Sequence, residues 1–458
     1  MNKNDILELE IIGMTLQGDG VARRGGLAVF VPGVCPGDTV RALILKVKPN
    51  CAFAKCLEVL TPGPGRIDAG CAAFPRCGGC AFRCLDYGLE LEIKQREARE
   101  TLRRIGGIEP LWEPILGAAS PERCRNKAML PVQAVGGRVR AGFYMRNSHR
   151  VVYGDDRKGD FDCLLQPKAF AHIAEAVCEW AQAVKCSLYD EKTGEGLLRH
   201  IYLRQGESEA GTQILVCLVV NGFGVPRADL LLQRLRGASR AVRGVMLSHN
   251  TRDTNVVLGD SQTLLWGSER VTQRLGGLDF TLSARSFFQV NPAQAERLYR
   301  LAERFADLTG QERVLDLYCG TGAAGLTMAG RCAELVGVEI VPQAVEDARH
   351  NAVQNGISNA RFLCMDAAKA AIQLSAEGWK PDVTLLDPPR RGCEPALLRT
   401  VAGMVPRRVV YVSCDPSTLA RDLALLRELG YHTTKAAPVD MFPRTGHVEC
   451  VALAERAG

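Results

Sequence analysis

What this chain lacks removes several classes of protein from consideration. No apolar run reaches the ~20 residues that a helix needs to cross a membrane, so we expect no membrane partner. Residues 1–5 lead into a strand-like segment and do not resemble a secretion signal, so we expect a cytoplasmic protein. Internal repeats and low-complexity segments are also missing from the sequence.

Neither sign of charge dominates the composition. The 458 residues include 57 Lys and Arg against 51 Asp and Glu, which leaves a net charge of +6. A mildly basic balance is compatible with nucleic acid but does not demand it. The length predicts two or three domains, and the 47% hydrophobic and 24% charged content is typical of a soluble globular protein.

Cysteine is the residue present in excess, with 18 in the chain. In a cytosolic protein such a count indicates metal binding or thiol chemistry more than disulfides. Cys71, Cys77 and Cys80 fall close together, Cys84 follows, and Cys163 is a distant candidate for a fourth ligand. Four thiolates fit either zinc or a [4Fe–4S] cluster. A zinc ribbon usually has two C-x2-C pairs and this segment has one, while the C-x3-C-x2-C spacing of radical enzymes is absent.

The pattern along the chain predicts three domains. Residues 1–62 consist of short alternating runs separated by glycine turns, as in a small OB-type barrel, although an SH3-like domain fits the same pattern. Residues 63–275 are predicted to form an α+β domain that carries the cysteine cluster. Residues 276–458 alternate strands and helices, which predicts an α/β domain with a doubly wound, Rossmann-like sheet.

A charged helix is predicted over residues 88–105, next to the cysteine cluster. It pairs acid and base four residues apart, with the acid first, which stabilises a helix. Its pairs are Glu90–Lys94, Glu92–Arg96 and Glu100–Arg104, and its predicted apolar stripe is Leu91, Ala98, Leu102 and Ile105.

The third domain contains a candidate nucleotide-binding site. Residues 314–322 form a strand followed by a glycine-rich turn, where the backbone can approach a ligand closely. Glu339 ends the next strand, where a carboxylate can take both hydroxyls of a ribose. Asp366 and Asp387 end the two strands after it, and Asp366 could take an adenine amino group. The set resembles S-adenosylmethionine methyltransferases. NAD binding is the alternative, but the turn lacks a full G-x-G-x-x-G.

Cys414 follows a short apolar strand and stands just before Pro416, a residue typical of the first helical position. Reactive groups of open α/β sheets lie at the carboxyl ends of strands, so we expect Cys414 and Asp387 to face one crevice. The helix dipole should lower the thiol pKa. Glu449 lies in the last apolar strand, where burial should raise its pKa and suit it to proton transfer. Alone, Cys414 would be interpreted as a buried inert thiol, Glu449 as a salt-bridged acid, and the neighbouring His447 as structural.

Arginines occur around these motifs. After Asp387-Pro388-Pro389, an amino-group methyltransferase usually has an aromatic residue, but this chain has Arg390 and Arg391. A cation there suits a phosphate or a developing oxyanion. Arg421 and Arg444 are further candidates for phosphate contacts, and all four could equally be solvated.

Taken together, these motifs resemble the RNA (uracil-5-)-methyltransferase family over nearly the whole chain. The resemblance rests on the cysteine spacing and Cys163, and on the segments at 286–291, 315–322, 387–390, 413–416 and 446–449, which occur in family order. It also identifies the barrel as a TRAM domain, an OB-type RNA-binding module.

The resemblance implies roles for individual residues. Cys414 is expected to be the nucleophile and Glu449 the base. S-adenosylmethionine is expected among Gln289, Tyr318, Glu339, Asp366 and Asp387, and Asp387 could also touch the target base. A [4Fe–4S] cluster is expected on Cys71, Cys77, Cys80 and Cys163, with Cys84 as a bystander. Relatives often carry a polar residue at Ala323, which here offers its backbone alone. Residues 91–118 are expected to pack on the catalytic domain.

The expected substrate is 23S ribosomal RNA, because the tRNA branch of the family usually lacks both the TRAM domain and the cluster cysteines; a tRNA 5-methyluridine methyltransferase is the alternative within the family. We expect a monomer and no DNA partner. Two alternatives come from other classes: an RNA-binding or RNA-folding factor with a vestigial transferase domain, and a methyltransferase acting on a small molecule or a protein side chain. The β-barrel argues against the second.

Overall fold

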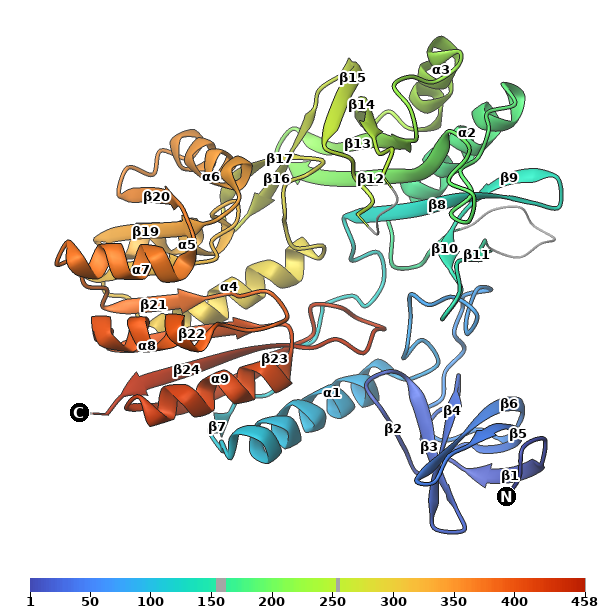
Figure 1. The fold of residues 1–458 in the computed structure, drawn as a ribbon, viewed down its shortest axis with the longest axis horizontal. Helices are drawn as coiled ribbons and strands as arrows, with labels where there is room; N and C mark the ends of the chain where they lie inside the picture. The colour runs from blue at the N-terminus through green and yellow to red at the C-terminus, as the bar shows by residue number, and fades with distance from the viewer. Residues whose placement is uncertain (154–161, 253–255, 458) are drawn as a thin grey trace.

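The computed structural model describes residues 1–153, 162–252 and 256–457. It has a β-rich N-terminal part, a central α+β part and a larger C-terminal α/β part, with the long helix α1 leading from the first toward the last (Figure 1). No helix in these ranges is both long and apolar enough to cross a membrane.

The N-terminal part is a six-stranded sheet in which β1 also contacts β3, as expected for a small barrel. The shortest of the six strands is β2, which has two residues. Its pairs are antiparallel except for β4 beside β6. Its strands are β1 (Ile6–Glu10), β2 (Gly13–Met14), β3 (Asp19–Arg24), β4 (Leu27–Pro32), β5 (Thr39–Val47) and β6 (Cys51–Thr61).

The central part is a mixed six-stranded sheet in the order β15-β14-β13-β12-β8-β9, with two helices packed on one face. Long apolar runs, such as residues 214–220, are buried throughout because these strands lie inside the sheet. The elements are β8 (Lys127–Val135), β9 (Arg138–Ala141), β10 (Phe143–Tyr144), β11 (Val151–Val152), α2 (Lys168–Ala183), β12 (Leu198–Ser208), β13 (Gly211–Val220), α3 (Ala228–Ala238), β14 (Val242–His249) and β15 (Ser261–Gly267).

The C-terminal part is an eight-stranded sheet in the order β20-β19-β18-β21-β22-β24-β23-β7. The first five strands in this order are parallel, which confirms the doubly wound prediction, and β24 is antiparallel to both its neighbours. The strands are β18 (Arg313–Leu317), β19 (Glu334–Glu339), β20 (Ala360–Cys364), β21 (Val383–Leu386), β22 (Arg408–Ser413), β23 (Tyr431–Val439) and β24 (Glu449–Arg456). A hairpin of β16 (Arg270–Leu275) and β17 (Leu278–Ser283) precedes this sheet.

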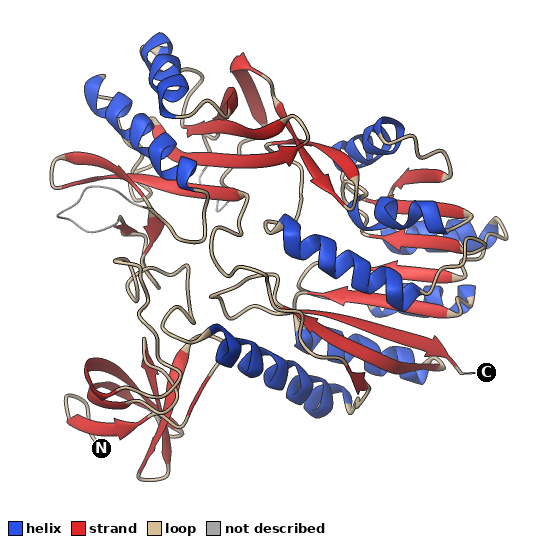
Figure 2. Ribbon diagram, turned by 180° about the vertical axis from the view of Figure 1, so that it is seen from behind, coloured by secondary structure: helices blue, strands red, loops and turns tan. Residues whose placement is uncertain are grey.

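Helices cover both faces of this sheet (Figure 2). Successive strand residues point to opposite faces, so Val314 joins one apolar core and Leu315 the other. The first core lies under α4 (Pro292–Ala306), α5 (Ala323–Met328), η2 (Ala329–Arg331) and α6 (Pro342–Gln354). The second lies under α7 (Ala367–Ala376), α8 (Pro395–Met404) and α9 (Pro416–Glu428).

The segment after the cysteine cluster lies against the C-terminal sheet. It forms α1 (Tyr87–Thr101), a π-helical turn η1 (Leu102–Gly106), and β7 (Leu111–Trp112), which pairs with β23. Ala98 and Leu102 are buried in the second core. The predicted apolar stripe is wrong at Ile105, which is 54% exposed. The wider π turn changes the angle between successive side chains, so a 3.6-residue period does not extend through it.

The η1 turn offers a matched test of this docking. Leu102→Ala should lower the free energy of unfolding by about 2–5 kcal/mol, because it empties a fully buried site between η1 and α9. Ile105→Ala, three residues away and exposed, should change it by no more than about 0.5 kcal/mol. Urea unfolding followed by circular dichroism measures both. Equal losses in the two variants would contradict the docking described here.

Candidate active site

Cys414 lies at the carboxyl end of β22, where the sequence placed it. Asp415 is the N-cap of α9, and its side chain accepts a hydrogen bond from the backbone N–H of Ser417 at 2.8 Å. Pro416 takes the first helical position, where its missing N–H leaves nothing unsatisfied. This tight strand-to-helix turn holds the half-buried Cys414 at the edge of the sheet.

Glu449 reaches the same edge from the neighbouring antiparallel strand. Ser413 pairs with Cys450 in the register of β22 and β24, so one further step brings Cys414 level with Glu449. Glu449 is 3% exposed. The register therefore sets a thiol and a buried carboxyl side by side, although they are distant in sequence.

Burial controls the electrostatics of this pair. Burial, followed by the nearby Asp387 carboxylate, raises the pKa of Glu449 to about 8, as the sequence predicted in direction. The predicted lowering of the Cys414 pKa is wrong. Burial, followed by the charge of Glu449, raises that pKa to about 11 and outweighs the helix end. Arg390 opposes the rise in both groups.

Asp387 and Gln289 lie near the pair formed by Cys414 and Glu449, next to Tyr299 on α4. Burial raises the pKa of Asp387 to about 7. Burial also raises the pKa of Tyr299, with Asp387, Asp316 and Glu449 contributing, while a hydrogen bond with the Gln289 side chain opposes the rise. The structure thus brings together three of the predicted site residues, Gln289, Asp387 and Glu449, and adds Tyr299.

The other predicted cofactor residues line a separate hollow of about 70 Å³ beside the glycine turn. Tyr318, Glu339 and Asp366 all border it. Glu339 accepts hydrogen bonds from the backbone N–H of Gly320 at 3.2 Å and of Val341 at 2.9 Å. One oxygen of Asp366 caps α7.

The backbone of the turn is itself unusual. Tyr318 and Gly322 have φ angles of 68° and 82°, and the non-glycine residue at such an angle is strained. Gly322 tolerates this conformation because it has no Cβ, and it starts α5 without a side-chain cap. The turn therefore reaches the hollow through Tyr318, and through the Gly320 N–H that holds Glu339.

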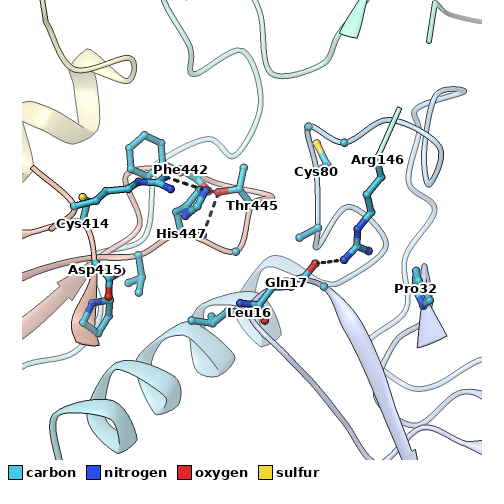
Figure 3. A pocket seen from close by; sticks show the side chains of 18 of the residues that line it. Leu16, Gln17, Pro32, Cys80, Arg146, Cys414, Asp415, Phe442, Thr445 and His447 are labelled. Atoms are coloured by element: carbon cyan, nitrogen blue, oxygen red, sulfur yellow. Dashed lines mark hydrogen bonds between the residues drawn. The ribbon is translucent and has the colours of Figure 1, made fainter. Parts of the chain in front are cut away.

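A cavity of about 800 Å³ lies in front of Cys414. Its walls come from three parts of the chain. They are the β2–β3 loop around Gln17, residues 78–81 of the cysteine loop (residues 71–85), and the edge around Cys414 and His447. Figure 3 shows Cys414 and His447 on one side of this cavity and Cys80 and Arg146 on the other. The cavity is thus open to a ligand that touches all three parts.

The arginines near the motifs divide into two groups. Arg390 is exposed in the cavity, where it lies 3.3 Å from the His447 ring nitrogen Nε2. Arg391 is exposed beside the cofactor hollow. Arg421 donates to the Arg391 and Cys393 carbonyls, and Arg444 is 5% exposed. Arg444 is therefore too buried to contact a phosphate, whereas Arg421 is exposed, with 52% of its side chain accessible.

The four cluster cysteines are near enough to influence one another. Burial raises the pKa of Cys80 to about 12, with Cys163 and Cys77 contributing. Burial also raises the pKa of Cys163 to about 11, with contributions from Cys77 and Cys71. Within the described ranges, no three His, Cys, Asp or Glu side chains are grouped closely enough to hold a single metal ion.

Cys84 faces away from this group. It is 1% exposed, and its sulfur lies 3.1 Å from that of Cys35 in the N-terminal part. Cys124, which the sequence analysis did not select, lies near Cys163, whose charge contributes to raising the Cys124 pKa behind the larger effect of burial.

Comparison with known proteins places this site in a family. A family model described as tRNA (uracil-5-)-methyltransferase matches residues 275–457, and a TRAM domain model matches residues 3–57. A protein of Halalkalibacterium halodurans, named as an RNA methyltransferase, is 41% identical over 99% of this chain and 98% of its own. A Clostridium tetani protein with the same kind of name is 39% identical over 99% and 97% of the two chains.

The chain belongs to the RNA uracil-5-methyltransferase family. A solved structure of the Pyrococcus abyssi tRNA (uracil-54, C5)-methyltransferase with S-adenosyl-L-homocysteine matches it at a TM-score of 0.75 and 26% identity. The match covers 98% of this chain and 100% of that one. The chain is thus an RNA methyltransferase that depends on S-adenosylmethionine, with an N-terminal TRAM domain.

Three site residues escaped the sequence analysis of this methyltransferase. Tyr299 looks like an ordinary core residue of an amphipathic helix, and nothing in its pattern shows that it meets three carboxyl groups. His447 was assigned a structural role, yet it is exposed in the cavity. Arg125 borders the same cavity and lowers the pKa of the nearby Cys80 thiol, against the larger effect of burial. The sequence signal for Arg125 would have been its position next to Cys124, which lies near Cys163.

The pKa values of this site predict how methylation depends on pH. In the roles expected from the resemblance, attack needs the Cys414 thiolate and proton removal needs the Glu449 carboxylate. Burial raises the pKa of Cys414 to about 11 and that of Glu449 to about 8. The rate should therefore rise as pH increases from about 6 to about 10. Arg390→Gln should move the profile to higher pH, because Arg390 lowers both pKa values. Arg399→Gln, an exposed change on α8, is the control, and a profile unmoved by Arg390→Gln would refute the assignment.

Proposed function

We propose that this protein transfers a methyl group from S-adenosylmethionine to carbon 5 of a uridine in 23S ribosomal RNA. The observation that carries the proposal is the placement of Cys414 against Glu449 at the edge of β22 and β24, beside the large cavity. A half-buried thiol and a buried carboxyl, both of raised pKa, would supply a nucleophile and a base on the same side of a substrate.

The chemistry needs both groups because carbon 5 of a uracil is a poor nucleophile. The Cys414 thiolate adds to carbon 6, and the electron pair moves to carbon 5, which takes the methyl group from the sulfonium and releases S-adenosylhomocysteine. Glu449 removes the carbon 5 proton, the carbon 5–carbon 6 double bond re-forms, and the thiolate leaves. This route divides one difficult step into easier ones.

The residues of the two pockets fit the methyl donor. Glu339 lies at a strand end beside a glycine turn, a position suited to ribose hydroxyls, and Asp366 and Tyr318 border the same hollow. Gln289 and Asp387 lie near Tyr299, and Asp387 is also near Cys414. In this proposal the donor supplies an electrophilic methyl group, and these residues hold it with that methyl toward the uridine.

The choice of RNA rests on weaker support than the chemistry. The sequence argument for 23S rRNA assumed that tRNA enzymes usually lack the N-terminal domain, but the archaeal enzyme named for tRNA uracil-54 matches this chain over almost its full length. Transfer RNA is therefore the second candidate. The cavity between the TRAM domain and Cys414 suits a single-stranded loop in either RNA, because the target base must leave its stack.

Labelled methyl transfer tests both the reaction and the substrate. Purified protein with tritiated donor should place label in 5-methyluridine of an unmodified 23S rRNA transcript and not in tRNA. Cys414→Ala should abolish the label, while Cys51→Ala, a change on β6 of the TRAM domain, should retain it. Label in tRNA alone would move the substrate and keep the chemistry. No label in either RNA would contradict the proposed reaction.

Removing the base should stall the same reaction at a visible stage. Glu449→Gln should add to uridine and become methylated but fail to release, so RNA and protein should accumulate as a covalent complex. Denaturing gels of the protein with end-labelled RNA detect that complex. A variant that turns over normally would show that Glu449 is not the base.

We further propose that Cys71, Cys77, Cys80 and Cys163 hold a [4Fe–4S] cluster. What supports the proposal is the donor set: four partly buried thiols near enough to influence one another, which is the ligand type that such a cluster takes. The glycines at 78 and 79 let the backbone turn around the group, and the Gly79 N–H donates to the Cys77 sulfur at 3.3 Å. In this proposal the cluster has a structural role and supports the wall of the cavity.

Colour and metal content test this assignment. Anaerobically purified protein should be brown, absorb near about 400 nm and carry about four iron atoms per chain. Cys80→Ser should lose most of the iron and the absorbance, whereas Cys84→Ala, in the same loop but turned toward Cys35, should keep them. One zinc ion per chain and no absorbance near that wavelength would contradict the cluster.

A further inference from the structure

The segment of residues 440–448, here called the clamp segment, joins β23 to β24 and leads directly into Glu449. Three other parts of the chain hold it: helix α1, the cysteine loop and the TRAM domain. Its contacts are unusually polar for a buried loop, and none of the reaction steps described above uses them.

Helix α1 holds the clamp segment through fully buried charges. Lys94 lies 2.7 Å from both the Glu90 and the Asp440 carboxylates, and all three side chains are 0% exposed. Lys94 also donates to the Phe442 carbonyl at 3.2 Å. Tyr87 donates to the second oxygen of Asp440 at 2.7 Å.

Arg444 extends this network to the cysteine loop. Its backbone N–H donates to Glu90 at 2.7 Å, and its guanidinium donates to the Leu85 carbonyl at 2.7 Å. Its own carbonyl accepts from the N–H groups of Ala81 at 2.7 Å and Phe82 at 3.1 Å. Arg444 adopts a φ of 68°, a strained angle that the surrounding contacts must impose.

The TRAM domain closes the third side. A Cβ on Gly446 would lie 1.6 Å from the Leu16 carbonyl oxygen, so the β2–β3 loop packs directly on the backbone of the clamp segment. A glycine is required at position 446 because no side chain fits between these two backbone segments. Residues 440–446 are thus fixed from three directions before the chain reaches His447 and Glu449.

The charges in the network balance. Glu90 and Asp440 supply two negative charges, and Lys94 and Arg444 supply two positive ones. Buried ion networks add little net stability, because desolvation cancels most of the attraction, but they discriminate strongly between one geometry and its alternatives. This network is therefore better suited to fixing a position than to stabilising the fold.

The position of Cys414, unlike that of Glu449, does not depend directly on the clamp segment. It follows β22 and precedes α9, both of which are held by the sheet and its second core. Glu449 is the first residue of β24, immediately after the clamp segment. A displacement of that segment would thus move the base and leave the nucleophile in place.

We propose that Lys94 is a positioning residue for proton removal: with Glu90, Asp440 and Arg444 it fixes the clamp segment so that Glu449 meets carbon 5 of the methylated uridine. This inference rests on the proposed function and deepens it. Lys94 acts through the backbone of residues 440–448 and touches neither RNA nor methyl donor.

The test removes one charge of each sign, so that the net charge of the buried network stays zero. Lys94→Met combined with Glu90→Gln keeps an acceptor for the Arg444 N–H but loses the ammonium bonds to Asp440 and Phe442. The matched control is Arg104→Met with Glu100→Gln, an exposed pair with the same spacing at the end of the same helical segment.

A misplaced base should slow turnover on uridine RNA by about 10- to 100-fold in kcat, with little change in KM for RNA. Covalent RNA–protein complex should accumulate, as expected for Glu449→Gln. RNA carrying 5-fluorouridine separates the steps, because its carbon 5 has no proton to remove. On that RNA the double variant should form the trapped complex within about threefold of the unaltered rate. The control pair should behave like the unaltered protein in every assay.

Several outcomes would overturn the inference. Unaltered turnover in a folded Lys94→Met, Glu90→Gln variant would show that the network does not position the base. An equal loss of trapping and turnover would show a general structural role. If the unaltered protein neither methylates nor traps any RNA, the proposed function itself fails, which is a distinct result.

A second measurement applies if the double variant does not fold. In the unaltered protein, the backbone amides of Arg444, Ala81 and Phe82 donate within the network and should exchange with deuterium slowly, like the core of β24. Free exchange of these amides would show that the clamp segment is not held and would refute the proposal.

Discussion

The site depends on one strand, β24, which runs antiparallel to both its neighbours in an otherwise parallel sheet. Because β24 inserts beside β22 with opposite direction, its first residue rather than its last lies at the carboxyl edge of the sheet. Glu449 can therefore stand against Cys414, which a parallel strand would not allow from that position in the chain. The low dielectric of that edge then raises the pKa of both groups, and Arg390 is the nearby cation that opposes the rise.

This arrangement requires support from outside the sheet. The loop that precedes β24 has its polar contacts on α1 and the cysteine loop, and its backbone packs on the TRAM domain. The cysteine loop and the TRAM domain also line the cavity in front of Cys414, and α1 adds Thr101. In the proposed function, the wall that would receive an RNA loop and the scaffold that would hold the base thus share these segments, so the accessory domains would contribute to the site as well as to binding.

The sequence predicted the doubly wound sheet because short apolar runs ending in Asp387 and Cys414 mark parallel strands and their carboxyl ends. It could not predict the network around Lys94. Glu90 and Lys94 stand four residues apart, the spacing of an exposed surface pair, and the Glu100–Arg104 pair with identical spacing is indeed exposed. Burial of one pair and not the other depends on Asp440, which lies far away in the sequence.

The electrostatic prediction for Cys414 failed for a related reason. A helix N-terminus lowers a thiol pKa by a local effect that the sequence shows, whereas the depth of the site and the approach of Glu449 are tertiary features. Ile105 failed because a π-helical turn shifts the register of the side chains, and no pattern in the residues announced it. Local signals selected the candidate site residues, and packing determined their surroundings.

The central claim is that one cysteine among 18 forms a bond to RNA. The most direct measurement traps the protein on RNA containing 5-fluorouridine, digests both polymers, and locates the attached nucleotide by mass spectrometry. The account predicts a methylated fluorouridine on the peptide that contains Cys414. Attachment at any other cysteine, or a methylated nucleotide with no protein bond, would contradict it.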